Sequence, residues 1–190
     1  MTDDTGMVLL AIARATIANL LGSTLSAPED ADWLIEPGAT FVTLRKSSAL
    51  RGCIGSLEAH RPLLVDLKAN AIAAAFRDPR FLPLSREELG EVRIEVSLLS
   101  PLRPIECASE ADALARLQPL EDGVVLEYGS ARATFLPQVW EDLPEPALFL
   151  RELKRKAGLP ASFWAGGMRL SRYSVAKYVE TEAAIMPLTA

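Results

Sequence analysis

The chain has 190 residues, of which 49% are hydrophobic and 24% are charged. This composition allows one ordinary domain, or two small lobes, to bury a core, and it excludes a disordered or fibrous protein. The net charge is −5 and the isoelectric point is about 5.0. Sequence-independent binding of nucleic acid requires an excess of Lys and Arg, so we expect no nucleic-acid partner.

The first apolar segment, residues 7–21, predicts a buried helix that ends near a glycine. It contains Arg14 and Asn19, is shorter than a membrane-spanning helix, and follows two aspartates rather than a basic region. Cys53 and Cys107 form neither a Cys-x-x-Cys pair nor a disulfide framework. We therefore expect a cytoplasmic protein with two free thiols and no membrane anchor.

A β-hairpin and a helix are predicted next. Residues 39–46 and 50–57 are rich in apolar and β-branched side chains and are joined by a short Ser-Ser-Ala connection. Pro62 suits the start of a helix with apolar residues at helical spacing. Asp78, which precedes a proline, ends this helix because such a residue avoids helical geometry.

Residues 92–98 alternate apolar and polar side chains and predict a strand. The later segments predict, in order, a short helix from Ser109 to Pro119, a hairpin of residues 123–127 and 132–136, a helix from Pro146 to Gly158, and a β-like segment at residues 169–179. This order lacks steady βαβ alternation. The predicted fold class is α+β, with mainly antiparallel or mixed β-sheet flanked by helices.

Residues 50–56 are the predicted functional focus. Gly52 and Gly55 bracket Cys53 inside a strand, where glycine normally marks a bulge or a close backbone approach. Arg51 would favour the thiolate of Cys53 and so support a nucleophile or a redox thiol. Two alternatives remain open, namely contact with a ligand without covalent chemistry, and simple core packing of the sulfur.

Residues 50–55, which read Leu-Arg-Gly-Cys-Ile-Gly, resemble the hallmark of the AMMECR family, the A component of the AmmeMemoRadiSam system. Further segments resemble family signatures in the expected order: residues 41–44, 78–84, 94–97, 135–140 and 156–158, and Tyr173. The resemblance extends from about residue 7 to residue 180, so residues 1–190 are interpreted as a single AMMECR-type domain. It implies an α+β fold in two unequal, interlocked subdomains that share a cleft.

The family name records an association with a Memo-like protein and a radical-SAM protein. The chain has no Cys-x3-Cys-x2-Cys cluster motif, so the radical chemistry would belong to a partner. The resemblance therefore favours a cytosolic binding or accessory component that acts with these two partners. The alternative is an enzyme that uses Cys53 as a nucleophile or redox thiol on a small anionic substrate. Neither interpretation requires a cofactor in this chain.

Charge points to a small anionic ligand. Residues 45–86 hold eight basic residues against three acidic ones, and residues 151–177 hold seven against one. Together they would form a cationic cleft if they meet, or two solvated faces if they do not. The loop at Asp78 could present Arg80 to such an anion, or could only fix the chain while Phe81 fills the core. The predicted site comprises Cys53 as the catalytic candidate and Arg51, Gly52, Ile54, Gly55, Asp78 and Arg80 as ligand-binding residues.

Other residues offer further candidate sites. His60 is the sole histidine, so a Cys-His dyad would need it, although a surface position before the helix is the favoured interpretation. Glu95 lies on the polar side of its strand and is interpreted as solvated rather than as the partner of an arginine. The glycine pair lacks the Lys-Ser/Thr ending of a phosphate-binding loop. No metal site is expected, because the His, Cys and carboxylate spacing matches no ligand set.

Overall fold

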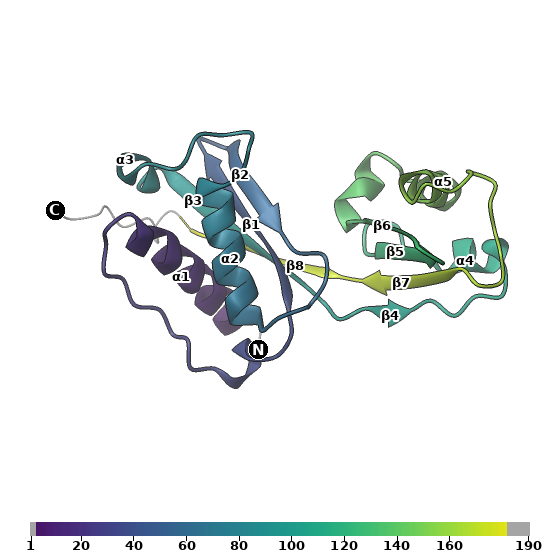
Figure 1. The fold of residues 1–190 in the computed structure, drawn as a ribbon, viewed down its shortest axis with the longest axis horizontal. Coiled ribbons are helices and arrows are strands. Elements are labelled where there is room, and N and C mark those ends of the chain that lie inside the picture. The colour runs from purple at the N-terminus through teal and green to yellow at the C-terminus, as the bar shows by residue number, and fades with distance from the viewer. Residues whose placement is uncertain (1–2, 182–190) are drawn as a thin grey trace. The chain divides into compact units, whose positions relative to one another are not determined.

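The structure is a computed structural model that describes residues 3–181 (Figure 1). The described residues form two compact units, each with its own sheet. One unit combines the chain before Ser100 with the last strand, and the other comprises Ser100–Val175. The predicted α+β class is confirmed. No helix in the described part of the chain is both long enough and apolar enough to span a membrane.

The first unit has a four-stranded sheet in the order β2-β1-β3-β8, and β1 runs antiparallel to both of its neighbours. Its strands are β1 (Ala39–Lys46), β2 (Ala49–Gly55), β3 (Val92–Leu99) and β8 (Val175–Val179), and its helices are α1 (Asp3–Leu20), η1 (Asp32–Leu34), α2 (Leu63–Phe76) and α3 (Arg86–Leu89). Figure 1 shows α1 and α2 side by side on one face of this sheet. Alternate residues of the strands, such as Val42, Leu44 and Val96, are buried against these helices.

Local chemistry explains the turns of this unit. Gly22 has a φ of +88°, so it can end α1 in the left-handed conformation. Ser47 and Ser48, with φ values of +49° and +69°, form the tight connection between β1 and β2. Two central residues with positive φ fit the twist of a two-residue hairpin. The hairpin is therefore one residue tighter than the Ser-Ser-Ala connection that the sequence predicts.

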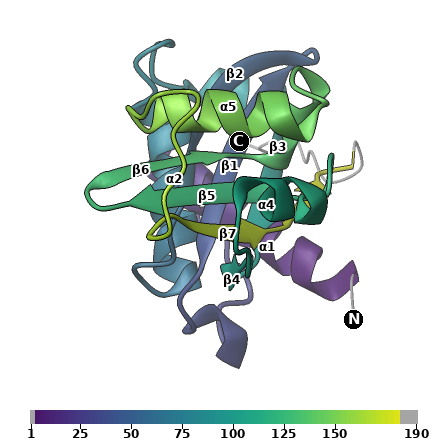
Figure 2. The ribbon, with the colours of Figure 1, turned by 90° about the vertical axis from the view of Figure 1, so that its right-hand side faces the viewer.

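The second unit has a four-stranded sheet in the order β4-β7-β5-β6, and Figure 2 shows α5 beside β6. Its strands are β4 (Arg103–Pro104), β5 (Gly123–Tyr128), β6 (Ala131–Phe135) and β7 (Arg169–Tyr173), and its helices are α4 (Glu110–Arg116), η2 (Pro137–Glu141) and α5 (Pro146–Lys156). Trp140 and Phe149 are fully buried and stack with their ring centres 3.7 Å apart. This stacked pair lies in the apolar core of the unit.

The structure differs from the predicted elements in two further respects. The short elements η1, α3, β4 and η2 were not predicted, because two to five residues are too few to display a hydrophobic period. The segment predicted as one strand at residues 169–179 is two strands, interrupted at Ser174, and these strands belong to different sheets. Sequence alternation alone does not say which sheet a strand joins.

Candidate functional site

A β-bulge lies at the centre of the hallmark string. Leu44 of β1 pairs with Gly52, whereas the next residue, Arg45, pairs with Leu50. Arg51 is therefore the extra residue of β2 and has no opposite residue on β1. A bulge redirects the side chain of the extra residue. The glycine pattern predicted such an irregularity.

Both glycines permit close packing. A Cβ on Gly52 would lie 2.2 Å from the carbonyl oxygen of Ala74 in α2. A Cβ on Gly55 would lie 2.2 Å from Cγ of the Phe41 ring. Ile54, between them, packs against the core of the first unit. These three residues of the predicted site thus hold β2 against its neighbours.

Arg51 is held by Glu88 of α3. Its Nε and Nη2 donate to Oε1 and Oε2 of Glu88 at 3.1 and 2.9 Å, which makes a bidentate pair. The Arg51 side chain is 13% exposed, and its guanidinium carbon lies 5.9 Å from the centre of the Phe81 ring. The hydrogen bonds from Arg51 lower the pKa of Glu88 to about 2. The Arg51 side chain therefore links the bulge of β2 to α3.

Asp78 joins the hallmark strand to Arg80. The backbone N–H of Cys53 donates to Oδ2 of Asp78 at 2.9 Å, and Arg80 donates to both Asp78 oxygens, from Nε at 2.9 Å and from Nη2 at 2.7 Å. Arg80 also donates to the carbonyl oxygen of Cys53 at 3.2 Å. The Asp78 side chain is 2% exposed, and the Arg80 hydrogen bonds hold its pKa well below the usual range. The Arg80 side chain, in contrast, is 52% exposed, so a buried carboxylate fixes an exposed guanidinium.

Cys53 is half-buried on the face of the sheet that is opposite α2, directly across from Thr43. The Thr43 hydroxyl donates to the Cys53 sulfur at 3.3 Å. His60, which a Cys-His dyad would require, pairs with Glu58 at 2.6 Å, and its side chain is 74% exposed. The structure thus gives the thiol a hydroxyl partner and places His60 at the surface with a carboxylate.

Glu95 corrects one interpretation. It is 7% exposed, and its carboxylate accepts from Nε of Arg45 at 2.9 Å and lies 2.7 Å from Nζ of Lys177. The prediction of a solvated side chain was therefore wrong. Its reason lies in the neighbouring strands, because β1 and β8 bring one cation each to the polar face of β3. Arg45 and Lys177 come from the two basic segments noted in the sequence.

Sequence reasoning also missed a buried polar cluster beside the hallmark string. Asp66 of α2 is 1% exposed and accepts from the backbone N–H and hydroxyl of Thr40, both at 2.8 Å. The same carboxylate accepts from the Ser56 hydroxyl at 2.6 Å, from Arg61 at 3.0 Å and from Asn70 at 2.9 Å. This cluster fastens the end of β2 to the first turns of α2.

Glu88 was missed as well, although the sequence carried a signal for it. Ser85 and Glu88 form a reciprocal capping box at the start of α3. A Ser-x-x-Glu string is the sequence signature of this motif. The signature could have located the helix, but not the arginine that Glu88 binds.

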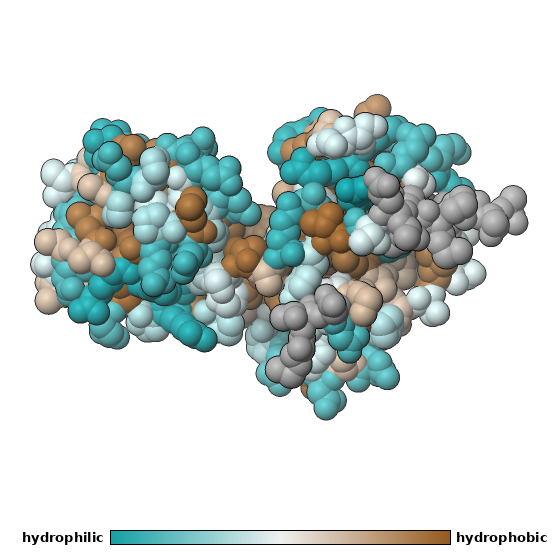
Figure 3. All heavy atoms as spheres, turned by 180° about the vertical axis from the view of Figure 1, so that it is seen from behind, coloured by the Kyte–Doolittle hydropathy of each residue, from teal (hydrophilic) through white to brown (hydrophobic). Residues whose placement is uncertain are grey.

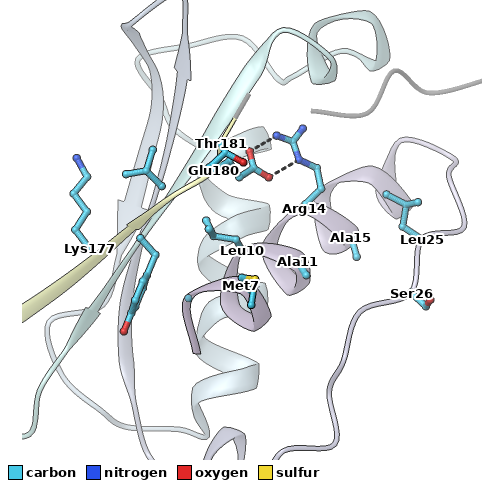
Figure 4. Close-up of a pocket in the computed structure, with 13 residues that line it drawn as sticks. Met7, Leu10, Ala11, Arg14, Ala15, Leu25, Ser26, Lys177, Glu180 and Thr181 are labelled. Atoms are coloured by element: carbon cyan, nitrogen blue, oxygen red, sulfur yellow. Dashed lines mark hydrogen bonds and ion pairs between the residues drawn. The ribbon is translucent and has the colours of Figure 1, made fainter. Parts of the chain in front are cut away.

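A separate groove lies between α1 and β8 and has a volume of about 740 Å³ (Figure 4). Met7, Leu10 and Ala11 line its helix side. At one end Arg14 donates to Glu180, and the carboxylate also accepts from the backbone N–H of Ile94. Arg14 further donates to the carbonyl oxygens of Leu89 and Val92 at 2.9 and 2.8 Å. This buried ion pair fastens α1 to the end of β8.

The surface is mostly hydrophilic. Figure 3, seen from behind, shows teal hydrophilic residues over much of the surface of each unit, with smaller brown hydrophobic patches among these residues. Within residues 3–181 no group of three or more His, Cys, Asp or Glu side chains is arranged to hold a metal ion.

Comparison with known proteins identifies the family. A match to the AMMECR1 family covers residues 10–178. A protein of Methanothermobacter thermautotrophicus is 42% identical over 84% of this chain and 85% of its own length. Protein MJ0810 of Methanocaldococcus jannaschii is 35% identical over 96% of this chain and 93% of its own. The crystal structure of the uncharacterized protein PH0010 from Pyrococcus horikoshii is similar with a TM-score of 0.75 at 31% identity, covering 95% of this chain and 93% of that one. The chain therefore belongs to the AMMECR1 family.

Proposed function

We propose that this protein is a cytoplasmic binding component that acts with a Memo-like protein and a radical-SAM protein. The proposed contact region is the Cys53–Arg80 surface, by which we mean Cys53, Arg80, Phe81 and Leu82. The association recorded in the family name suggests the partners. The contact region is suggested by the way in which the hallmark string is held.

The observation that carries the proposal is the bridge made by Asp78. Its buried carboxylate binds the backbone of Cys53 and the guanidinium of Arg80 at once. The guanidinium therefore needs little further ordering when it binds, and such preorganisation favours affinity. Arginine is enriched among the residues that contribute most to protein interfaces. Leu82, which is 83% exposed two residues further on, would add an apolar contact.

The internal contacts of the hallmark string favour binding over catalysis. Arg51 is neutralised by Glu88, and Gly52 is required by the close approach of α2. A catalytic cysteine is normally activated by an adjacent base or cation. The partner of the Cys53 sulfur is the hydroxyl of Thr43, which is not a base at neutral pH. The string thus serves mainly to build a rigid support for the exposed residues.

Co-purification of the three proteins tests the proposal. The full chain, carrying an affinity tag, is expressed in cells that encode all three proteins, and the bound partners are quantified. We expect the wild type to retain both partners, and Arg80→Glu and Leu82→Ser to lose them. Arg169→Glu is the matched control, because its side chain is 74% exposed in the second unit. Failure of the wild type to retain either partner would refute the proposal, as would equal loss with the control variant.

An enzyme that uses Cys53 on a small anionic substrate is the second candidate. One observation favours it, since the Thr43 hydroxyl donates a hydrogen bond to the Cys53 sulfur and so orients it. Burial raises the pKa of the Cys107 thiol, so Cys107 is the internal reference. The enzyme hypothesis predicts that a thiol probe labels Cys53 faster than Cys107 at neutral pH. A Cys53→Ser change that leaves cellular function intact would eliminate it.

A further inference from the structure

A second hollow lies on the face of the first sheet that is opposite α1 and α2. Its volume is about 760 Å³, and it is lined by residues of β1, β3 and β8 together with the Ser47-Ser48 turn. Small-molecule sites commonly have volumes of roughly 300–1,000 Å³. We propose that this hollow binds a small molecule that carries a phosphate group, at a site distinct from the Cys53–Arg80 surface.

Glu95 organises the cations of the hollow. Its Oε1 accepts from Nε of Arg45 at 2.9 Å, and its Oε2 lies 2.7 Å from Nζ of Lys177. The Glu95 side chain is 9% exposed, whereas those of Arg45 and Lys177 are 39% and 47% exposed. One buried negative charge therefore holds two positive charges at the rim, and it leaves them accessible to an anion.

The charge of the lining suits an anion. The charged residues that line the hollow are three bases, Arg45, Arg93 and Lys177, and two acids, Glu91 and Glu95, so their formal charge is +1. A phosphate monoester carries about two negative charges at neutral pH, so a bound phosphate group would balance this excess.

The register of the strands supplies an independent argument. Arg45 of β1 lies directly opposite Arg93 of β3 in the antiparallel pair. Like charges at such positions destabilise a sheet, because their Cβ atoms are only about 4.5–5.5 Å apart. Glu95 already offsets part of this repulsion through its contact with Arg45, and a bound anion would offset more of it. The juxtaposition therefore agrees with an anionic ligand in the hollow.

Donor geometry fits a phosphate group. Nη1 of Arg45 donates to the carbonyl oxygen of Ser48 at 3.1 Å, so two contacts fix the guanidinium before any ligand arrives. Arginine, lysine and serine hydroxyl groups are all suitable donors to phosphate oxygens. Ser47 and Ser48 both line the hollow. Figure 4 shows Lys177 extending from β8 away from the side chains of α1, toward the open face of the sheet.

Titration of the full chain with inorganic phosphate at constant ionic strength tests the site. Backbone amide shifts are followed by NMR, and succinate is titrated in parallel as a dicarboxylate of similar charge. We expect saturable shifts at Ser47, Ser48 and Lys177 with phosphate, and at least fivefold weaker binding of succinate. Shifts that do not saturate, that lie elsewhere, or that are equally strong with succinate would overturn the proposal.

Charge variants make the test specific. We expect Lys177→Gln to raise the dissociation constant of phosphate at least tenfold, and Arg93→Gln at least fivefold. Arg169→Gln removes one positive charge from the second unit and should change the constant less than twofold. A control effect equal to the others would mean an adventitious ion only and would overturn the site. None of these residues belongs to the Cys53–Arg80 surface. The outcome of the phosphate titration is therefore independent of the outcome of the co-purification test.

Discussion

Replacing Gly52 by Ala tests whether the hallmark glycine is needed for packing. The new Cβ would lie 2.2 Å from the Ala74 carbonyl oxygen, whereas ordinary contacts begin near 3.4 Å. The obstacle is helix backbone, so α2 or β2 must move by about 1 Å to relieve the overlap. Well-packed interiors resist such shifts, and overpacking typically costs about 1–3 kcal/mol.

The matched control is Gly90→Ala in the same unit. No atom within 4 Å would meet a Cβ at Gly90, and its φ of −71° is open to any residue. Alanine at such a position restricts the unfolded chain and should be neutral or stabilising by up to about 1 kcal/mol.

Urea denaturation followed by far-UV circular dichroism and by tryptophan fluorescence measures both variants. We expect the free energy of unfolding to fall by about 1–3 kcal/mol for Gly52→Ala, and the Tm to fall by roughly 3–10 °C. Trp33 reports on the first unit and Trp140 on the second. Equal stability of the Gly52 and Gly90 variants would refute the packing argument and would leave direct ligand contact as the reason for the glycine.

Three further predictions concern buried polar groups. Arg14→Met should lower the free energy of unfolding by about 3–5 kcal/mol in urea titrations, because it leaves the Glu180 carboxylate, which is 4% exposed, without its cation. A loss below about 1 kcal/mol would contradict this. Arg51 lowers the pKa of Glu88 from 4.5 to about 2, so the stabilisation is complete above pH 4.5 and is lost as the pH falls toward 2. The stability gap between wild type and Arg51→Met should therefore shrink between pH 5 and about 2, and a constant gap would refute the assignment. Asp78→Asn should loosen the link that the Asp78 carboxylate makes between the Cys53 backbone and Arg80, so a maleimide should label the Cys53 thiol faster. An unchanged labelling rate would argue that this link does not restrain Cys53.

The wider fold could largely be predicted from local patterns. Alternation placed β3, and the glycine and proline signals located the ends of α1 and α2 near the observed residues. The hallmark glycines predicted an irregular strand, and the structure has a bulge at Arg51. These features depend on residues close in the chain, so their physical causes are visible in the sequence.

Pairings between distant residues could not be predicted in this way. The partner of Arg51 is 37 positions away, and the cation that meets Glu95 from β8 is 82 positions away. Glu95 was interpreted as solvated because a sequence displays only the neighbours on its own strand. The sheet order β2-β1-β3-β8 supplies the neighbours that bury it.

By itself the sequence determined the family, the α+β class and the location of the hallmark string, since these follow from composition, periodicity and ordered motifs. Only the tertiary structure decided what each residue of the string does. It assigned Arg51 to Glu88, Gly52 to the approach of α2, and Arg80 to a surface position fixed by Asp78. The physical reason is that hydrogen bonds and packing act between atoms within a few ångströms, and chain folding alone determines which distant residues come that close.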